Sequence, residues 1–204
     1  MKKLLIISLC VFAAACAKTP EQKAEAIIKE AIQNTLVLPD SYQAVETQLD
    51  SAFTPYNDPE FIAVVLDMCK KGIEINALDS QMRSAKSSMS VWSGPYQTPF
   101  GREQYKQAKD EYDAAKADYD ALVGRMQKMA EGLREKAEKE PEFIGYRVHH
   151  RFRAINNAGN LILSGRHFLF DKEITKIVAQ WSEEEIDVYN EFLKRSAEAA
   201  EMAK

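Results

Sequence analysis

Two long segments of the chain place apolar side chains at helical spacing. In the first, the steps are threes, fours or their sums, at Phe61, Val65, Met68, Gly72, Ile75, Met82, Ala85 and Met89. In the second, steps of three and four alternate strictly, at Tyr105, Ala108, Tyr112, Ala115, Tyr119, Leu122, Met126, Met129 and Leu133. Such a heptad pattern is typical of a helix that packs along one seam against another helix. We therefore predict two long helices.

Only residues 91–98 (VWSGPYQT) separate the two segments, so the helices can be neighbours only if they run antiparallel. Asp58 and Thr98 are the expected N-caps, because each precedes a proline suited to the first helical position. At 1.5 Å per residue, the helical arm would be roughly 45 to 60 Å long. The pattern leaves open whether the seam closes within one chain or between two.

Period-two alternation predicts strands before and after this arm. Residues 42–53 alternate apolar or small side chains at Val45, Thr47, Leu49, Ser51 and Phe53. Residues 144–153 place Ile144, Tyr146, Val148, His150 and Phe152 on one face and Arg147, His149, Arg151 and Arg153 on the other. Turn formers at 156–160 (NNAGN) and 171–172 separate two further strands, LILSGRHFLF and ITKIVAQW. Two hairpins in succession predict an antiparallel sheet.

Capping signals predict one helix at each end of the chain. Thr19 with Gln22, and Ser182 with Glu185, have the spacing of a capping box. We therefore predict an α+β fold: a small four-stranded antiparallel sheet with N- and C-terminal helices and a long inserted antiparallel helical hairpin resembling a coiled coil. The expected base domain comprises residues 16–57 and 141–204, and the arm comprises residues 58–140.

Residues 1–15 have the pattern of a bacterial lipoprotein signal peptide. Lys2 and Lys3 precede an apolar stretch, 4–12, that is shorter than the roughly 20 residues of a membrane span. Three alanines then precede Cys16, and this stretch resembles a lipobox, although Ala13 stands where leucine is usual. Since lipidation requires a cysteine at the cleavage site and ordinary secretion does not, we expect a diacylglyceryl anchor on Cys16. Plain secretion is the alternative.

The net charge and the cysteine count exclude some partners and bonds. The chain has 27 Lys and Arg against 31 Asp and Glu, and loss of Lys2 and Lys3 with the signal would move the net charge from −4 to about −6. Nucleic-acid-binding domains are usually basic, so we expect no nucleic-acid partner. Cys69 would have no intramolecular disulfide partner once Cys10 is removed and Cys16 is lipidated, and we interpret it as a small buried hydrophobe.

Two stretches of the chain carry a family resemblance. DSYQAVETQLDSAF (40–53), followed by EPEFIGYRVHHRFRAINNAGNLILSGRHFLFDKEITKIV (140–178), resembles a family of small bacterial envelope lipoproteins of unknown activity. The likeness lies in strand and turn patterns. It implies an anchored envelope protein and supplies no functional residues.

The first candidate site is basic. Arg147, His149, Arg151 and Arg153 share a strand face, and Arg166 and His167 lie on the hairpin partner, so several side chains could converge on an anion. Guanidinium groups suit the phosphates and carboxylates of head groups and cell-wall fragments. The alternative is a solvated face, or one neutralised by a neighbouring helix such as the acidic last one.

The second candidate site is aromatic. Trp92, Tyr96 and Phe100 cluster with Val91 around Gly94-Pro95 at the far end of the arm. Exposed aromatic groups far from a core often mark a contact with a partner protein. Alternatively, these side chains pack on one another and seal the end of the hairpin.

Catalytic and metal sites are not indicated. Adjacent His149 and His150 point to opposite faces of a regular strand, so they cannot share one metal ion, and Ser164 and His167 are likewise opposed. We expect no cofactor, no metal and no enzymatic activity. The hypotheses are a lipid-anchored interaction module acting through its arm, facing the periplasm, and, as an alternative, a binding domain for an anionic envelope ligand.

Overall fold

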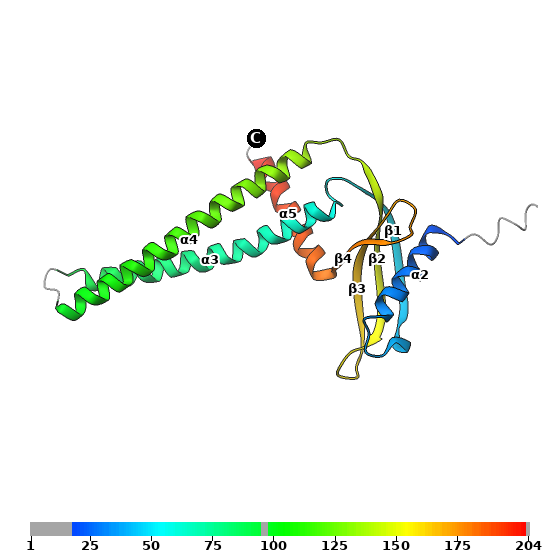
Figure 1. Ribbon diagram of the computed structural model, residues 1–204, viewed down its shortest axis with the longest axis horizontal. Coiled ribbons are helices and arrows are strands. Elements are labelled where there is room, and N and C mark those ends of the chain that lie inside the picture. The colour runs from blue at the N-terminus through cyan, green and yellow to red at the C-terminus, as the bar shows by residue number, and fades with distance from the viewer. Residues whose placement is uncertain (1–17, 95–97, 203–204) are drawn as a thin grey trace, which may run out of the picture. The chain divides into compact units, whose positions relative to one another are not determined.

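The computed structural model describes residues 18–94 and 98–202 (Figure 1). In chain order, its elements are α2 (Pro20–Gln33), the short 3-10 helix η2 (Pro39–Ser41), β1 (Gln43–Phe53), α3 (Pro59–Trp92), α4 (Pro99–Ala137), β2 (Phe143–Ile155), β3 (Leu161–Phe170), β4 (Ile177–Ser182) and α5 (Glu183–Met202). The predicted α+β fold, with a helical hairpin inserted between the first two strands, is confirmed.

The described chain divides into two compact units. The sheet unit contains the residues up to Asp58 together with Pro141–Asp187, and the arm unit contains Pro59–Glu140 and the chain from Val188 onward. The expected division placed all of 141–204 with the sheet. In the structure the boundary falls within α5, after Asp187.

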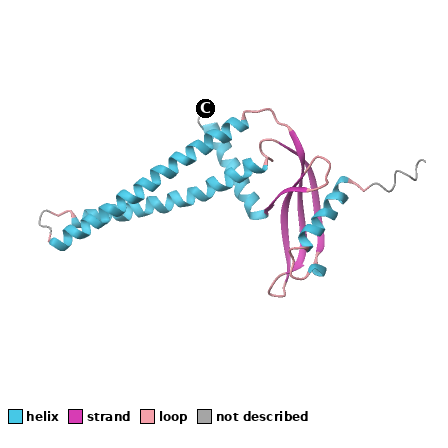
Figure 2. Cartoon of the chain, viewed as in Figure 1, coloured by secondary structure: helices cyan, strands magenta, loops and turns pink. Residues whose placement is uncertain are grey.

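The sheet is antiparallel throughout, in the order β1-β2-β3-β4 (Figure 2). In the register of the two central strands, His150 lies opposite Arg166 and His149 lies opposite His167. Directly opposed residues in an antiparallel pair share a face. The register therefore decides which polar side chains of β2 and β3 meet.

β1 departs from the regular alternation that its sequence predicts. Register shifts occur between Ala44 and Glu46 and between Ala52 and Phe53. Leu49 packs against the core, whereas Val45 is 47% and Phe53 44% exposed. An irregularity of this kind changes the direction of the residues beyond it, so the strand buries only part of its predicted apolar set.

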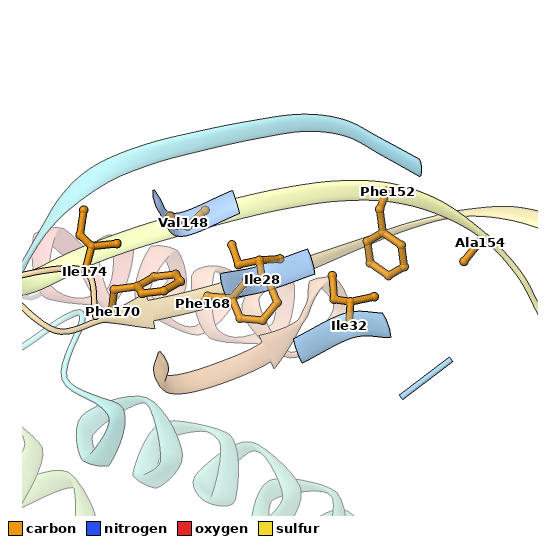
Figure 3. Packing of buried hydrophobic residues seen from close by; sticks show 9 residues of the cluster. Ile28, Ile32, Val148, Phe152, Ala154, Phe168, Phe170 and Ile174 are labelled. Atoms are coloured by element: carbon orange, nitrogen blue, oxygen red, sulfur yellow. The ribbon is translucent and has the colours of Figure 1, made fainter. Parts of the chain in front are cut away.

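Helix α2 covers one face of the sheet and closes the core. Its buried residues Ala24, Ile28 and Ile32 meet side chains of β2 and β3 (Figure 3). The sheet contributes Val148, Phe152, Ala154, Phe168 and Phe170. Full burial of one large aliphatic or aromatic side chain stabilises a fold by about 1.5–3 kcal/mol. The apolar stripe of α2 therefore supplies a large share of the stability of the sheet unit.

Both predicted capping boxes form. In α2 the Thr19 hydroxyl accepts from the Gln22 backbone N–H, and the Gln22 side chain accepts from the Thr19 N–H. At α5, Ser182 and Glu185 make the same reciprocal pair, at 3.1 and 2.9 Å. These contacts satisfy N–H groups that a helix start otherwise leaves without partners.

α3 and α4 lie side by side as an antiparallel pair within one chain (Figure 1). Every predicted seam residue is buried or half-buried, and Ala85, Ala108, Ala115, Leu122 and Leu133 are among those that are at most 8% exposed. The seam therefore closes within the chain. With 34 and 39 residues, the helices measure about 51 and 58 Å.

The chain segments on either side of the insertion are joined at the sheet. The Thr54 N–H donates to the Glu142 carbonyl oxygen at 2.9 Å, and the Glu142 N–H donates to the Thr54 hydroxyl at 2.8 Å. The two strand ends that lead into and out of the arm are thus held by contacts of the sheet unit itself.

Gly145 in β2 tests the packing of the sheet. Its φ is +146°, and a Cβ built on it would lie 1.9 Å from the Phe170 carbonyl oxygen. We expect Gly145→Ala to lower the unfolding free energy by more than about 2 kcal/mol, because it combines an unfavourable backbone conformation with a steric overlap against main chain. Urea unfolding followed by circular dichroism measures the change.

Gly159 is the matched control. It also has a positive φ, +82°, but nothing lies within 4 Å of a Cβ at that position. Gly159→Ala should cost only about 1–2 kcal/mol, the penalty of the left-handed region. Equal costs at the two positions would show that the close approach of Phe170 does not constrain the sheet.

Candidate functional site

The face of the sheet opposite α2 carries most of the predicted anion-binding residues. Arg147, His149, Arg151 and Arg153 alternate along β2 with the buried residues Val148, His150, Phe152 and Ala154. Their shared face, which the alternation predicts, agrees with the register of β2 against both neighbours. We call these four residues the basic row.

Acidic residues of β1 lie beside the basic row. Arg147 lies opposite Asp50 and Arg151 opposite Glu46, with nitrogen-to-oxygen distances of 3.7 and 3.8 Å. All four side chains are at least 39% exposed, so each pair contributes about 1 kcal/mol or less to stability. The pairs nevertheless balance two of the charges that an anionic ligand would use.

Glu183, the first residue of α5, reaches the same face. Its carboxylate lies 3.1 Å from Nε2 of His149, and a Cβ on Gly165 would lie 1.9 Å from its Oε1. Gly165 therefore provides the space that this side chain occupies. The sequence leaves open that acidic residues of the last helix neutralise this face, and Glu183 contacts a residue of the basic row. The acids of β1 were missed, although Glu46, Gln48 and Asp50 alternate in the sequence.

His149 and His167 stack on this face with their ring centroids 4.4 Å apart and their planes 9° apart. Burial, followed by the nearby His149 and Arg147, lowers the pKa of His167 to about 4. A metal ion lies near the plane of each imidazole that binds it, so two stacked, parallel rings do not converge on one ion. Residues 18–94 and 98–202 contain no group of three or more His, Cys, Asp or Glu arranged to hold a metal.

Arg166 does not join the basic row, contrary to the prediction. It lies opposite His150 and Ser182, on the face that α2 covers. The loop between Ile155 and Leu161 sets this register, because those two residues are partners and the count from them places 166 against 150. The predicted convergence of Arg166 with Arg147, Arg151 and Arg153 is therefore wrong.

His150 is a core residue, as its position on the apolar face predicts. It is fully buried, and its ring is hydrogen-bonded to the hydroxyls of Tyr42 at 2.7 Å and Thr47 at 2.9 Å. Tyr42, His150 and Phe152 stack on one another at 5.7–6.0 Å between ring centroids. Burial, with a further contribution from His149, lowers the pKa of His150 to about 4, so the imidazole is neutral at pH 7.

The arm tip contains two of the three predicted contact residues. Trp92 and Phe100 meet edge to face with their ring centroids 5.7 Å apart, and Trp92 also lies over Gly101. Tyr96 lies outside the described residues. Phe100 is still 60% and Val91 70% exposed. The aromatic groups therefore pack partly on one another and partly present an apolar surface.

Two further predicted features can be placed. Ser164 lies opposite Phe152 and His167 opposite His149, so they occupy opposite faces, as predicted. Cys69 is a half-buried free cysteine whose thiol pKa is raised by burial. The expected lipidation site, Cys16, lies outside the residues that the structure describes.

No family model, curated protein or solved structure matches this chain. Within the described residues, no helix has the length and apolar character needed to cross a membrane.

His150 predicts a pH dependence of stability. Its imidazole protonates near pH 6.5 in the unfolded chain but only near pH 4 in the folded one, so the unfolded state binds more protons between these values. The unfolding free energy should therefore fall as the pH decreases from 6.5 to 4, by up to about 3 kcal/mol for this one residue. Urea unfolding at several pH values measures the slope.

The variant His150→Gln should lose part of this slope, whatever its stability at pH 7. Thr47→Val is the control, because it removes a hydrogen bond to the ring but keeps the histidine, so it should retain the slope. An unchanged slope in His150→Gln would contradict the assignment.

Proposed function

We propose that the protein is a lipid-anchored, non-enzymatic interaction module of the bacterial cell envelope, and that the tip of its helical arm contacts another envelope protein. The observation that carries the proposal is the exposed apolar surface of Val91 and Phe100 at the end of a hairpin whose seam is already closed. Since the arm needs no second chain to bury its seam, this surface is available to a partner.

The composition of the tip supports a protein contact. Aromatic residues are enriched at the energetic centres of protein interfaces. The edge-to-face packing of Trp92 against Phe100 restrains both rings before any partner arrives. Groups held in this way lose less conformational freedom on binding, which favours affinity. Single exposed apolar residues elsewhere on the arm, such as Ile73, need no such explanation.

The location in the envelope rests on the signal pattern and on the family resemblance. Anchoring by lipid requires more than one acyl chain for stable membrane attachment, and a diacylglyceryl cysteine meets this condition. Cys16 precedes the start of α2 at Pro20 by only a few residues. A short tether would hold the sheet unit close to the membrane surface, facing the periplasm.

The alternative function, binding of an anionic ligand on the basic row, has less support. Asp50, Glu46 and Glu183 already lie against Arg147, Arg151 and His149. An anion at this face would have to displace those carboxylates or bind beside them.

The arm-tip contact is tested by crosslinking in the envelope. A photoreactive phenylalanine analogue at position 100 should capture a stoichiometric protein partner, and Val91→Ser with Phe100→Ser should reduce capture of that protein through a crosslinker placed elsewhere on the arm at least tenfold. Truncation of residues at an interface centre commonly costs 2 kcal/mol or more, which corresponds to such a loss.

Ile73 offers the matched control, since it is 72% exposed on α3 but lies away from the tip. Ile73→Ser should leave capture unchanged, and the analogue at position 73 should capture nothing. Equal capture from positions 73 and 100 would refute the tip as the contact.

Lipidation is tested separately. Cys16→Ser should abolish incorporation of labelled palmitate and move the protein from the membrane to the soluble fraction, because the anchor is its only expected membrane attachment. Cys10→Ser should change neither result, since Cys10 would leave with the signal. Palmitate labelling that persists in Cys16→Ser would disprove the anchor.

A further inference from the structure

A groove of about 460 Å³ opens on the α2 side of the sheet. It lies where the loop after α2 meets the hairpin of β2 and β3. The lining comes from three segments, namely residues 35–37 after α2, Phe152 and residues 154–158 at the end of β2, and Ile162, Ser164 and Arg166 on β3. Its volume falls within the range typical of small-molecule sites, about 300–1,000 Å³.

Most of the groove is apolar. Phe152 and Ala154 are buried beneath it at 4% and 3% exposure, whereas Val37 and Ile162 at its sides are 67% and 43% exposed. Ala24, Ile28 and Ile32 already fill the core beside it. The groove is therefore apolar surface that continues the core but that α2 does not cover.

One end of the groove carries a positive charge. Arg166 lines it and forms no ion pair with any residue of 18–94 or 98–202, in contrast to Arg147 and Arg151 on the other face. Ser164 lies on the same side of β3 two residues away and also lines the groove. His150, the cross-strand neighbour of Arg166, is neutral.

An acid that shares a cavity with Arg166 already has a hydrogen-bond partner. Arg166 also lines a second, smaller cavity of about 240 Å³, together with Ser182 and Glu185. The Glu185 carboxylate accepts the Ser182 N–H at 2.9 Å as part of the α5 capping box. Since Glu185 makes no ion pair with Arg166 among the described residues, the guanidinium can receive an anionic group from a ligand.

We propose that this groove binds a fatty-acid-like monocarboxylate, with the acyl chain along Phe152, Ala154 and Ile162 and the carboxylate at Arg166 and Ser164. An apolar channel that ends in one guanidinium is complementary to an apolar chain that ends in one carboxylate. The inference rests on the sheet unit alone and stands or falls independently of the arm-tip contact.

An extended peptide fits this groove less well than an acyl chain. A peptide needs partners for its backbone N–H and C=O groups, but several polar groups at the groove are already used. The Thr35 hydroxyl donates to the Ile32 carbonyl oxygen, and the Asn156 side chain accepts from the N–H groups of Ala158 and Asn160. β3 pairs with β2 along its length and with β4 from Arg166 to Phe170, so a peptide could add only at the outer edge of Leu161–Gly165, not on the apolar face where the groove lies.

The test is a titration of the full chain carrying Cys16→Ser, so that no acyl chain of its own competes. Dodecanoate below its micelle concentration should produce saturable amide shifts in the two-dimensional NMR spectrum at Ala154 and Ile162. Acetate, which lacks the chain, and dodecyltrimethylammonium, which reverses the charge, should each bind at least tenfold more weakly. Equal binding of acetate would show a simple anion site, and equal binding of the ammonium compound would show a merely apolar one. Either result overturns the proposal.

Two variants and one control locate the site. Arg166→Gln should weaken dodecanoate binding at least tenfold, whereas Arg153→Gln, which removes an arginine from the opposite face of the same sheet, should change it less than twofold. Ile162→Ser should also weaken binding, because it shortens the apolar surface. Folding of each variant is checked by circular dichroism. An equal loss in Arg153→Gln, or no saturable shift in the parent chain, refutes the groove as the site.

Discussion

The pairing of β2 with both of its neighbours determines where every polar group of the sheet unit lies. A shift of this strand by one residue would move His150 and Phe152 out of the core and bring His149 and Arg151 into it. The buried hydrogen bonds of His150 to Tyr42 and Thr47 disfavour such a shift, because an imidazole buried without partners is costly. The rings of Tyr42 and Phe152 stack on the His150 imidazole, and a shift of the strand would break that packing as well. One neutral histidine thus stabilises the register of β2 against β1, while the loop between Ile155 and Leu161 sets that of β2 against β3.

The same register separates two chemically different surfaces. On the side opposite α2, acids of β1 and α5 lie close to basic groups of β2, and the local charge is nearly balanced. On the α2 side, Arg166 stands at the end of an apolar groove without an ionic partner among the described residues. A count of basic residues along the chain would rank the first surface above the second. Pairing across the strands reverses that ranking, because it decides which charges remain available to a ligand.

Local patterns allowed most of the fold to be predicted. The capping box of Thr19 and Gln22, the heptad seam from Tyr105 to Leu133 and the alternation of β2 all depend on residues close in sequence, and all appear in the structure. Long-range features were harder. The irregularities in β1 depend on contacts with residues of β2 that lie about 90 to 110 positions away in the sequence, and no local signal marks them. The face on which Arg166 lies could have been predicted, since the length of the loop between Ile155 and Leu161 fixes the pairing of β2 with β3. Knowing only that residue 166 belongs to the partner strand does not reveal that face.

The hydrogen bonds between Thr54 and Glu142 make the sheet unit independent of the length of the arm. They join the end of β1 to the start of β2 within the sheet unit. The pairing of these strand ends therefore does not depend on how long the inserted hairpin is. Adding or removing one heptad in each of α3 and α4 would preserve the seam and change the length of the arm by about 10 Å. The length of the arm can therefore differ in heptad steps without any change in the contacts of the sheet unit that carries it.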